Sequence, residues 1–449
     1  MEQNSIPSGK VERAMRFMKT GVQIGGNYIK HYSKKLVDPE LTKDALHEEN
    51  AEDVYNALSE LKGSALKVAQ MLSMEKNVLP RQYTNKFIMA QYSAPPLSGP
   101  LIVQTFVKQF GKAPQELFER FDMKASNAAS IGQVHQAEKD GKKLAVKIQY
   151  PGVADSIKSD LKIVKPIAFR LLELNEKEFD KYIKEVESKL LEETDYELEL
   201  KRSKEFTSLC AHIPDLVFSN YYEEFKSKRV LVMDWLPGLH LDEFLKTNPS
   251  QEVRDRIGQA MWNFYEFQVH ALKAVHADPH PGNFLMMEDG RLGIIDFGCV
   301  KEIPEDFYYH YFALLVPEIM QDEASITRIM EQQQIINPED SPEARKVITN
   351  AFLRMTNLLR EPFNHEVFDF GNDAYIDEIY KLGDEVSKMK ELRNSKEGRG
   401  SQHALYINRT YFGIYSMLNM LRARIRTGIG SWSEPLIQYH IAEEKALQD

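Results

Sequence analysis

The chain has 449 residues, 43% of them hydrophobic and 28% charged, which is typical of a globular protein with more than one core. Its net charge of −10 argues against broad, sequence-independent binding to nucleic acid. Two cysteines, Cys210 and Cys299, are too few for a disulfide framework or a zinc site, and with no signal-peptide pattern at the N-terminus they indicate a reducing, cytoplasmic setting.

The first predicted element is a basic amphipathic helix in residues 10–35. This segment carries seven Lys and Arg against one acid, Glu12. Its apolar residues recur at roughly helical spacing: Val11, Ala14, Met15, Met18 and Val22. Such a helix can lie on an anionic membrane surface, which would make the protein peripheral on the inner face of the membrane. The alternative, slightly favoured by the sequence, is a helix docked on the rest of the protein with its basic side in water.

The remaining pattern predicts three regions. Residues 1–120 form a helical extension, broken near its end by SAPPL (93–97); 121–236 form a small strand-rich lobe; and 237–449 form a larger helical lobe. In the small lobe, 131–138 and 144–150 read as a hairpin with an Asp-Gly turn, a charged helix covers about 176–208, and 228–238 contains a strand. In the large lobe, 284–296 reads as a second Asp-Gly hairpin, and 410–421 as a buried helix too short to span a membrane.

The candidate catalytic and metal-binding residues lie in two segments, HADPHPGN (276–283) and IIDFG (294–298). An Asp, an Asn five residues later and a second Asp after a short hairpin form the pattern of phosphoryl-transfer enzymes. Asp278 would orient the acceptor hydroxyl or water, or take its proton. Asn283 and Asp296 would hold Mg²⁺ against the phosphates of ATP, because hard oxygen ligands suit Mg²⁺. A second Asp-Phe-Gly at 369–371 has no Asn partner and no hairpin, so we interpret it as a decoy loop.

Upstream, Lys147 in AVK (145–147) lies in the predicted strand from which a kinase lysine reaches the α- and β-phosphates. The alternative is an edge-strand lysine whose stem lies along apolar surface. The strand at 228–238 is followed by Pro-Gly and is where a kinase-like fold binds adenine; the alternative for these residues is ordinary packing between lobes. The candidates for this hinge are Met233, Asp234, Trp235 and Leu236.

Two usual kinase features are missing from the sequence. No G-x-G-x-x-G precedes Lys147, and its place is taken by the alanine-rich ASNAASIGQVH (125–135), whose single glycine is Gly132. No A-P-E follows the Asp-Phe-Gly, and the chain runs almost directly into a helix. A protein kinase needs a longer segment there to dock a peptide, so ordinary protein-kinase activity is disfavoured.

These motifs, in this order, resemble the UbiB/AarF family of atypical kinases, and most of all its branch of coenzyme Q kinase-like ATPases. GSALKVAQMLS (63–73) resembles the family's K-x-G-Q segment, AASIGQVH (128–135) its alanine-rich loop, and ETDYELE (193–199) its E-x-D segment. The resemblance covers about residues 10–430. It implies a protein-kinase-like α+β bilobal fold with the helical extension packed over the nucleotide cleft.

The resemblance also implies roles for individual residues. Glu199 would pair with Lys147, Glu193 and Asp195 would link the extension to the small lobe, and Lys67 and Gln70 would occlude the cleft. Taken alone, those carboxylates would read as a solvated helix face, and Lys67 and Gln70 as a surface pair. The alanine-rich loop would bind nucleotide through Ala128, Ala129 and Ser130. The implied ligands and partners are ATP, Mg²⁺, a prenyl lipid or quinone precursor, an anionic membrane surface and enzymes of quinone biosynthesis.

The sequence departs from the family at two positions. Ala69 stands in place of the glycine of the K-x-G-Q segment, and Asn127 stands where an alanine usually opens the loop. Both departures put the nucleotide preference and the rate in question.

Three functions are compatible with these motifs. The first is an ATPase that supports isoprenoid quinone biosynthesis at a membrane; the second is a phosphotransferase acting on a small molecule or lipid. The third is a nucleotide-sensing scaffold without turnover, which ATP would stabilise without releasing phosphate.

Overall fold

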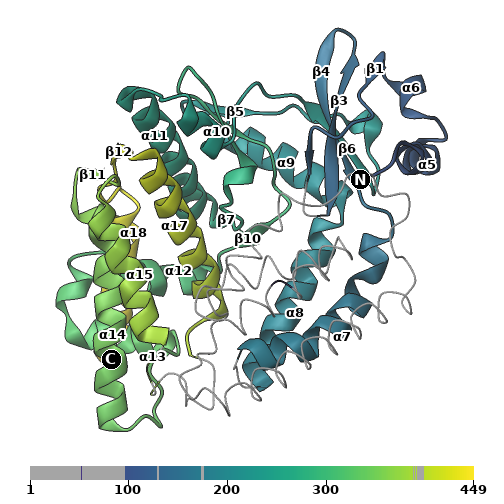
Figure 1. Cartoon of the computed structure of the whole chain (residues 1–449). Coiled ribbons are helices and arrows are strands. Elements are labelled where there is room, and N and C mark those ends of the chain that lie inside the picture. The colour runs from purple at the N-terminus through teal and green to yellow at the C-terminus, as the bar shows by residue number, and fades with distance from the viewer. Residues whose placement is uncertain are drawn as a thin grey trace, which may run out of the picture. The chain divides into compact units, whose positions relative to one another are not determined.

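The computed structural model describes residues 52, 97–128, 131–172, 176–387, 389, 391 and 399–448. These residues fall into two compact units (Figure 1). The first unit contains the described residues up to Lys204 together with Asn220–Trp235, and the second contains Glu205–Ser219 and the chain from Leu236 onward. The predicted basic helix at 10–35 and the segment with Lys67, Ala69 and Gln70 lie outside the described residues.

The first unit is built on a five-stranded antiparallel sheet. Its strands are β1 (Arg120–Phe121), β2 (Asn127–Ala128), β3 (Gly132–Lys139), β4 (Lys142–Gln149) and β6 (Val230–Asp234), in the order β1-β3-β4-β6 with β2 also paired to β3. The hairpin expected between β3 and β4 is confirmed. Its turn residues Asp140 and Gly141 have φ of 52° and 71°, which matches the twist of the flanking strands.

The helices of the first unit correct one sequence prediction. The unit contains α5 (Gly99–Phe110), α6 (Pro114–Leu117), α7 (Val153–Leu172), α8 (Glu176–Glu193) and α9 (Tyr196–Cys210), the last of which continues into the second unit. The single helix predicted for 176–208 is wrong, because the chain breaks between α8 and α9. Asp195 lies in this break and begins α9: its carboxylate accepts a hydrogen bond from the Leu198 N–H at 3.0 Å, as an N-cap does.

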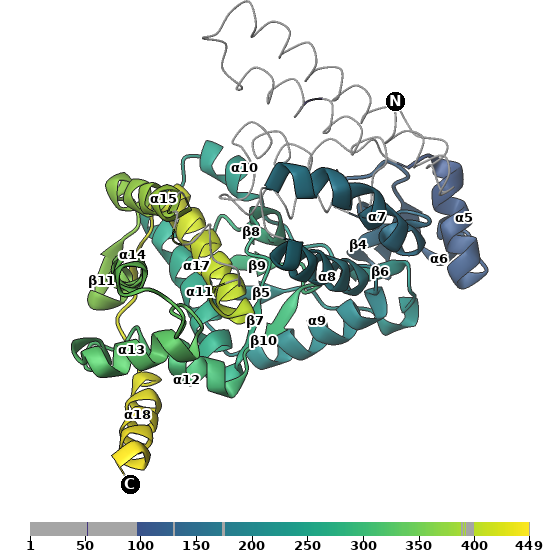
Figure 2. The same ribbon diagram turned by 90° about the horizontal axis from the view of Figure 1, so that it is seen from below.

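The second unit is mainly helical, as predicted. Its helices are α10 (Leu241–Lys246), α11 (Gln251–Phe267), α12 (Glu305–Ala313), α13 (Glu323–Gln332), α14 (Pro342–Arg360), α15 (Asp373–Ser387), α17 (Gln402–Leu421) and α18 (Ser433–Gln448). The buried helix expected at 410–421 is confirmed as part of α17, which packs beside α11 (Figure 2). The contact includes Trp262 stacked on Tyr415, with ring centroids 6.2 Å apart.

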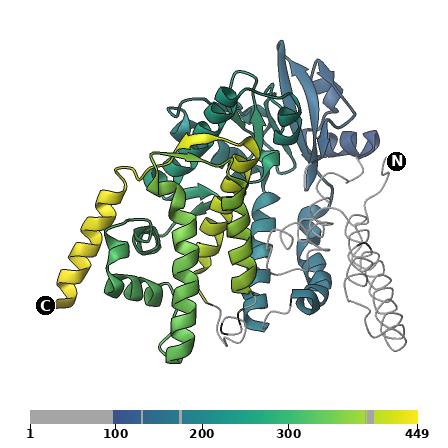
Figure 3. The same ribbon diagram turned by 60° about the vertical axis from the view of Figure 1, so that its left-hand side comes forward.

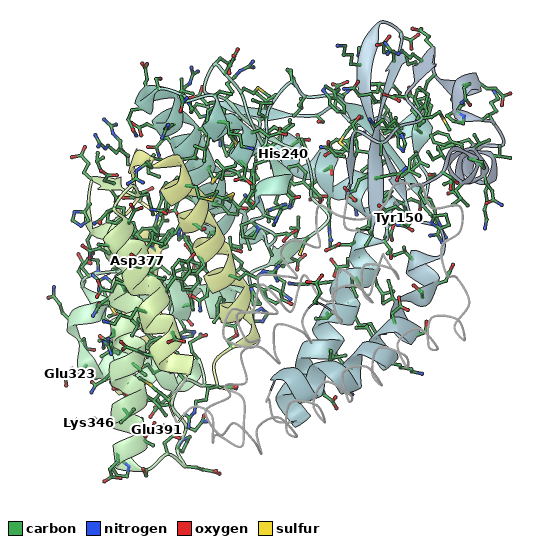
Figure 4. The ribbon with its side chains drawn as sticks, viewed as in Figure 1. Tyr150, His240, Glu323, Lys346, Asp377 and Glu391 are labelled. Carbon is green, nitrogen blue, oxygen red and sulfur yellow. The ribbon has the colours of Figure 1, made fainter. Side chains whose placement is uncertain are left out.

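Several helices of this unit present charged side chains to solvent. Glu323, Lys346 and Asp377, on α13, α14 and α15, are exposed (Figure 4). The last helix, α18, packs on α12 and carries the C-terminus (Figure 3). Among the described residues, no helix has both the length and the apolar character that crossing a membrane requires.

Short strands connect the helices of the second unit and hold its central loops. β7 (Ala274–His276) pairs with β10 (Val300–Glu302), β11 (Val367–Asp369) pairs with β12 (Arg424–Arg426), and β9 (Leu292–Ile294) lies between β5 (Leu216–Phe218) and β8 (Phe284–Met286). The second predicted hairpin is therefore confirmed as β8 and β9. Its turn includes Gly290, at φ 85°.

Helix α17 approaches the loop after β7 very closely at Gly413. A Cβ atom at this position would lie 2.5 Å from Pro279 Cγ and 2.9 Å from the Pro279 carbonyl oxygen. A helix interior normally disfavours glycine, which is about 1 kcal/mol worse than alanine there. We infer that Gly413 is present because the two backbones must lie in direct contact.

We therefore expect Gly413→Ala to lower the free energy of unfolding by about 1–3 kcal/mol, the usual cost of overpacking a filled interior. The matched control is Gly383→Ala on α15, where a Cβ atom would meet nothing within 4 Å. That change should raise stability by up to about 1 kcal/mol. Urea unfolding of both variants tests this, and equal shifts in one direction would contradict the close-approach argument.

Candidate active site

Lys147 and Glu199 form a buried ion pair in the first unit. Lys147 lies on β4 and Glu199 on α9, with Nζ 2.7 Å from Oε1, and the two side chains are 9% and 1% exposed. The Lys147 ammonium also lies 5.1 Å from the centre of the Tyr196 ring. The structure thus joins the strand lysine to the helix glutamate that the family resemblance implied. A pair this buried is stable only while both charges are present.

The position of Lys147 follows from the packing around β4. Gly132, at the start of β3, lies so close that a Cβ atom would be 2.4 Å from the Ile148 carbonyl oxygen. On the other side, Gln149 donates to the Thr194 carbonyl at 2.9 Å, which ties the end of β4 to the junction between α8 and α9. These contacts hold β4 against the helix that carries Glu199.

The alanine-rich loop leads onto the strand beside Lys147. Asn127 pairs with Val134, and Val134 pairs in turn with Lys147. Ala128 belongs to β2, whereas Ala129 and Ser130 lie outside the described residues. The role of this loop in binding nucleotide therefore stays a prediction.

The predicted hinge residues end the sheet of the first unit. Met233 is 4% exposed and Asp234 accepts a hydrogen bond from the Tyr222 hydroxyl at 2.6 Å. The backbone N–H groups of Asp234 and Trp235 donate to Asn220 and Lys143 carbonyls at 2.9 and 3.0 Å. These two N–H groups are therefore engaged within the unit, and the role of Met233–Leu236 in binding adenine stays a prediction.

Glu193 and Asp195 lie at the break between α8 and α9. Glu193 is the last residue of α8, and Asp195 caps α9 as described above. Lys67 and Gln70 lie outside the described residues, so the predicted link to the helical extension stays a prediction.

In the second unit, His276 joins the two predicted catalytic loops. It is fully buried, and its Nε2–H donates to the Asp296 carbonyl at 2.9 Å. Burial lowers the pKa of His276, so the ring is neutral, and we assign the Nε2–H tautomer from its partners. Nδ1 then accepts from the Tyr265 hydroxyl at 3.3 Å. We conclude that His276 fixes the backbone of the segment 276–283 relative to that of the segment 294–298.

Asp278, Asn283 and Asp296 lie within this hydrogen-bonded pair of loops. The Asn283 amide donates to the Asp278 carbonyl at 2.9 Å and to its carboxylate at 3.3 Å. The Asn283 carbonyl accepts from the Ile295 N–H at 3.2 Å, which brings Asn283 next to Asp296. Asp296 Oδ1 accepts from the Gly298 N–H at 2.7 Å. The loop is also held at Phe284, whose carbonyl accepts from His240, labelled in Figure 4, at 3.2 Å.

These residues fit a magnesium ion shared with phosphates. The side-chain amide nitrogen of Asn283 donates to Asp278. The side-chain oxygen of Asn283 and the Asp296 carboxylate would then be the oxygen ligands of the ion. Within the described ranges, no group of three or more His, Cys, Asp or Glu side chains is arranged to hold a metal ion by itself. An ion held here would take its other ligands from phosphates and water.

Arg409 is a site residue that sequence reasoning missed. It lies on α17, and its Nη2 is 3.5 Å from Asp278 Oδ1, with both side chains less than 20% exposed. The segment 276–283 itself contains no Lys or Arg. Arg409 and Asp278 are 131 positions apart, so no local sequence pattern connects them. The only indication in the sequence was that an arginine precedes the apolar part of α17.

The second Asp-Phe-Gly has the same local turn but different surroundings. Asp369 Oδ1 accepts from the Gly371 N–H at 2.8 Å, as Asp296 does from Gly298. However, Asp369 ends strand β11, where a loop was expected, and its carboxylate pairs with Arg424 at 3.1 Å. The turn by itself therefore does not distinguish a metal site.

Comparisons with known proteins identify a family model and several relatives that this chain resembles. Residues 89–330 match the model of the ABC1 atypical kinase-like domain. Over 80% of this chain and 67% of the relative, the chain is 28% identical to the probable serine/threonine-protein kinase abkA of Dictyostelium discoideum. It is 28% identical to the mitochondrial atypical kinase COQ8B of Danio rerio, over 85% of this chain and 62% of that relative. It is 27% identical to the mitochondrial atypical kinase COQ8 of Saccharomyces cerevisiae, over 84% of this chain and 76% of that relative. The matches thus span roughly two thirds of these relatives.

A solved structure is similar over most of its length. The Mycobacterium tuberculosis protein Rv3197, determined as a complex with erythromycin, superposes with a TM-score of 0.60 and is 27% identical. The match covers 88% of this chain and 97% of that one. The expected kinase-like α+β fold, with an antiparallel sheet followed by a helical part, is confirmed for the described residues.

We predict that Lys147→Met lowers the free energy of unfolding by about 3–5 kcal/mol, because it leaves the Glu199 carboxylate buried without its partner. Lys147→Met combined with Glu199→Leu should be less destabilising than the single change. The control is Lys204→Met, which breaks the exposed Lys204–Glu223 pair and should have little effect. Urea unfolding of the wild type and these three variants measures this, and a double variant at least as unstable as Lys147→Met would contradict it.

Proposed function

This chain belongs to the ABC1 atypical kinase-like family, and from that premise we propose that it binds Mg²⁺–ATP and hydrolyses it in support of isoprenoid quinone biosynthesis at a membrane surface. The observation that carries the proposal is the pair of hydrogen-bonded loops that holds Asp278, Asn283 and Asp296. Membership in a kinase-like family implies nucleotide binding.

Each residue has a distinct part in the proposed reaction. Lys147, kept charged and oriented by Glu199, binds the α- and β-phosphates. Asn283 and Asp296 supply oxygen ligands to Mg²⁺, which neutralises charge on the phosphates when bound. Asp278 accepts a hydrogen bond from the attacking water and orients it, and Arg409 holds the Asp278 carboxylate in place.

The structure argues against a peptide as phosphate acceptor. After Gly298 the chain forms the short strand β10, and Pro304 then precedes helix α12, which begins at Glu305. A peptide substrate would need a longer segment between these points.

The quinone and membrane parts of the proposal rest on the family resemblance and on the matches to atypical kinases named COQ8 and COQ8B. The proposed setting is the cytoplasmic face of a membrane, with the basic segment at 10–35 as its contact. A hydroxylated small molecule or lipid as acceptor is a second candidate. It is supported by Asp278, because the same carboxylate that orients water can orient a hydroxyl.

Asp296→Asn should abolish Mg²⁺-dependent release of phosphate from ATP, because it removes an anionic ligand of the ion. Asp369→Asn, in the second Asp-Phe-Gly, is the matched control and should retain turnover. Phosphate release by both variants is measured with and without vesicles that contain anionic lipid. Transfer of the labelled phosphoryl group from ATP to a lipid extract is measured separately. We expect vesicles to raise turnover. Tight ATP binding with no release or transfer under any condition would instead favour a scaffold.

Arg409→Gln should lower kcat about tenfold, equivalent to about 1.4 kcal/mol, because Asp278 is no longer held by a cation. Arg409→Lys should restore part of the rate.

Arg422→Gln, at the other end of α17, removes an exposed pair with Asp373 and serves as the control. Equal loss of rate in the Arg409 and Arg422 variants, with no rescue by Arg409→Lys, would mean that Arg409 only stabilises α17.

A further inference from the structure

The second unit contains a cavity of about 790 Å³ that is separate from the residues of the proposed ATPase reaction. One face of α11, from Arg256 to Glu266, forms one wall, and strand β12 forms another. The chain after β12 closes one end with Trp432. Neither Asp278, Asn283, Asp296 nor Arg409 lines it. Its volume lies within the range of about 300–1,000 Å³ that is usual for small-molecule sites.

One end of the cavity is aromatic and uncharged. The Trp432 ring stacks on His270, with centroids 3.9 Å apart and planes at 4°. Glu266 beside it is 16% exposed and accepts a hydrogen bond from the Tyr411 hydroxyl at 3.1 Å. Burial raises the pKa of Glu266 to about 8 and lowers the pKa of His270 well below its usual value. Both groups are therefore mainly neutral at pH 7.

The charged side chains that line the other end are three arginines and two aspartates. Two of its three arginines are paired, Arg256 with Asp215 and Arg424 with Asp369. The third, Arg426, has no acidic partner in the part of the chain that the structure describes. Its backbone is fixed, because the Arg426 N–H donates to Gln259 Oε1 at 2.8 Å and β12 pairs with β11. The exposed Arg426 guanidinium is thus held at the rim of the cavity by a rigid strand.

The remaining acid at this end, Asp255, is hydrogen-bonded by neutral donors from α11 and β12. The Asp255 carboxylate accepts from the Arg424 N–H at 2.7 Å and from the Gln251 amide at 2.8 Å, on the α11 side of β12. Gln259 and Asn263, which lie between the two ends, hydrogen-bond to each other at 3.0 Å and supply neutral polar surface.

We propose that this cavity binds a small organic anion with a flat apolar body, its single negative group on Arg426 and its ring system against Trp432. A nucleotide does not suit it, because several phosphate charges would face a single arginine, Arg426, without an acidic partner among the described residues. The site is independent of the proposed ATPase function.

The test uses three probes with the same ring: 2-naphthoate, neutral 2-naphthamide and cationic 2-naphthylmethylammonium. The full chain is labelled with ¹⁵N-tryptophan, since it has only three tryptophans, Trp235, Trp262 and Trp432. Their indole N–H signals are assigned with Trp→Phe variants and followed during titration. We expect 2-naphthoate to shift the signals of Trp432 and Trp262, to leave that of Trp235 unchanged, and to bind at least tenfold more tightly than the amide.

Arg426→Gln should weaken 2-naphthoate binding at least tenfold, whereas Arg354→Gln, an exposed arginine on α14, should leave it unchanged. Arg426→Glu should reverse the preference, so that the ammonium probe binds more tightly than the carboxylate. The indole signals themselves report whether each variant is folded. Binding by no probe, equal binding of acid and amide, or unchanged affinity in Arg426→Gln would overturn the proposal.

Discussion

The hydrogen bond from the buried His276 imidazole to the Asp296 carbonyl is the contact on which the candidate active site depends. Two loops separated by a hairpin meet there, and flanking backbone bonds from Ala277 to Cys299 and from Ile295 to Asn283 extend the contact in both directions. Because the His276 ring is buried and neutral, the contact costs no desolvated charge. Asp278, Asn283 and Asp296 are consequently held in place before any ligand arrives, which is the condition for electrostatic catalysis.

The two units hold their polar groups by different physical means. In the first, Lys147 and Glu199 are both charged and nearly inaccessible, so each is stabilised chiefly by the other. In the second, the carboxylates remain partly accessible and are oriented by backbone N–H groups, an amide and one arginine. This difference suits the proposed roles, since a lysine that binds phosphate must keep its charge while ligands of Mg²⁺ must stay open to it.

Helix α17 braces the second unit in three places. Gly413 lies against Pro279, Arg409 lies beside Asp278, and Tyr411 donates to Glu266 at the base of the cavity. Arg409 also supplies the positive charge that the segment 276–283 lacks. A substitution in the middle of α17 is therefore expected to affect the catalytic loop and the cavity together, since residues in contact couple energetically.

The sequence by itself determined the elements whose cause is local. Asp140-Gly141 and Asp289-Gly290 specify tight turns through positive φ, and the order and spacing of the Lys147, Asp278, Asn283 and Asp296 motifs identified the family. It did not reveal the break at Asp195, because an Asp within a charged helical run is equally compatible with a solvated face; only the completed cap distinguishes the two. Tertiary structure alone brought Arg409 to Asp278 and assembled the cavity from α11, β12 and the chain around Trp432. These contacts join segments more than a hundred residues apart, and hydrophobic periodicity specifies which face of a helix is buried but not which distant element covers it.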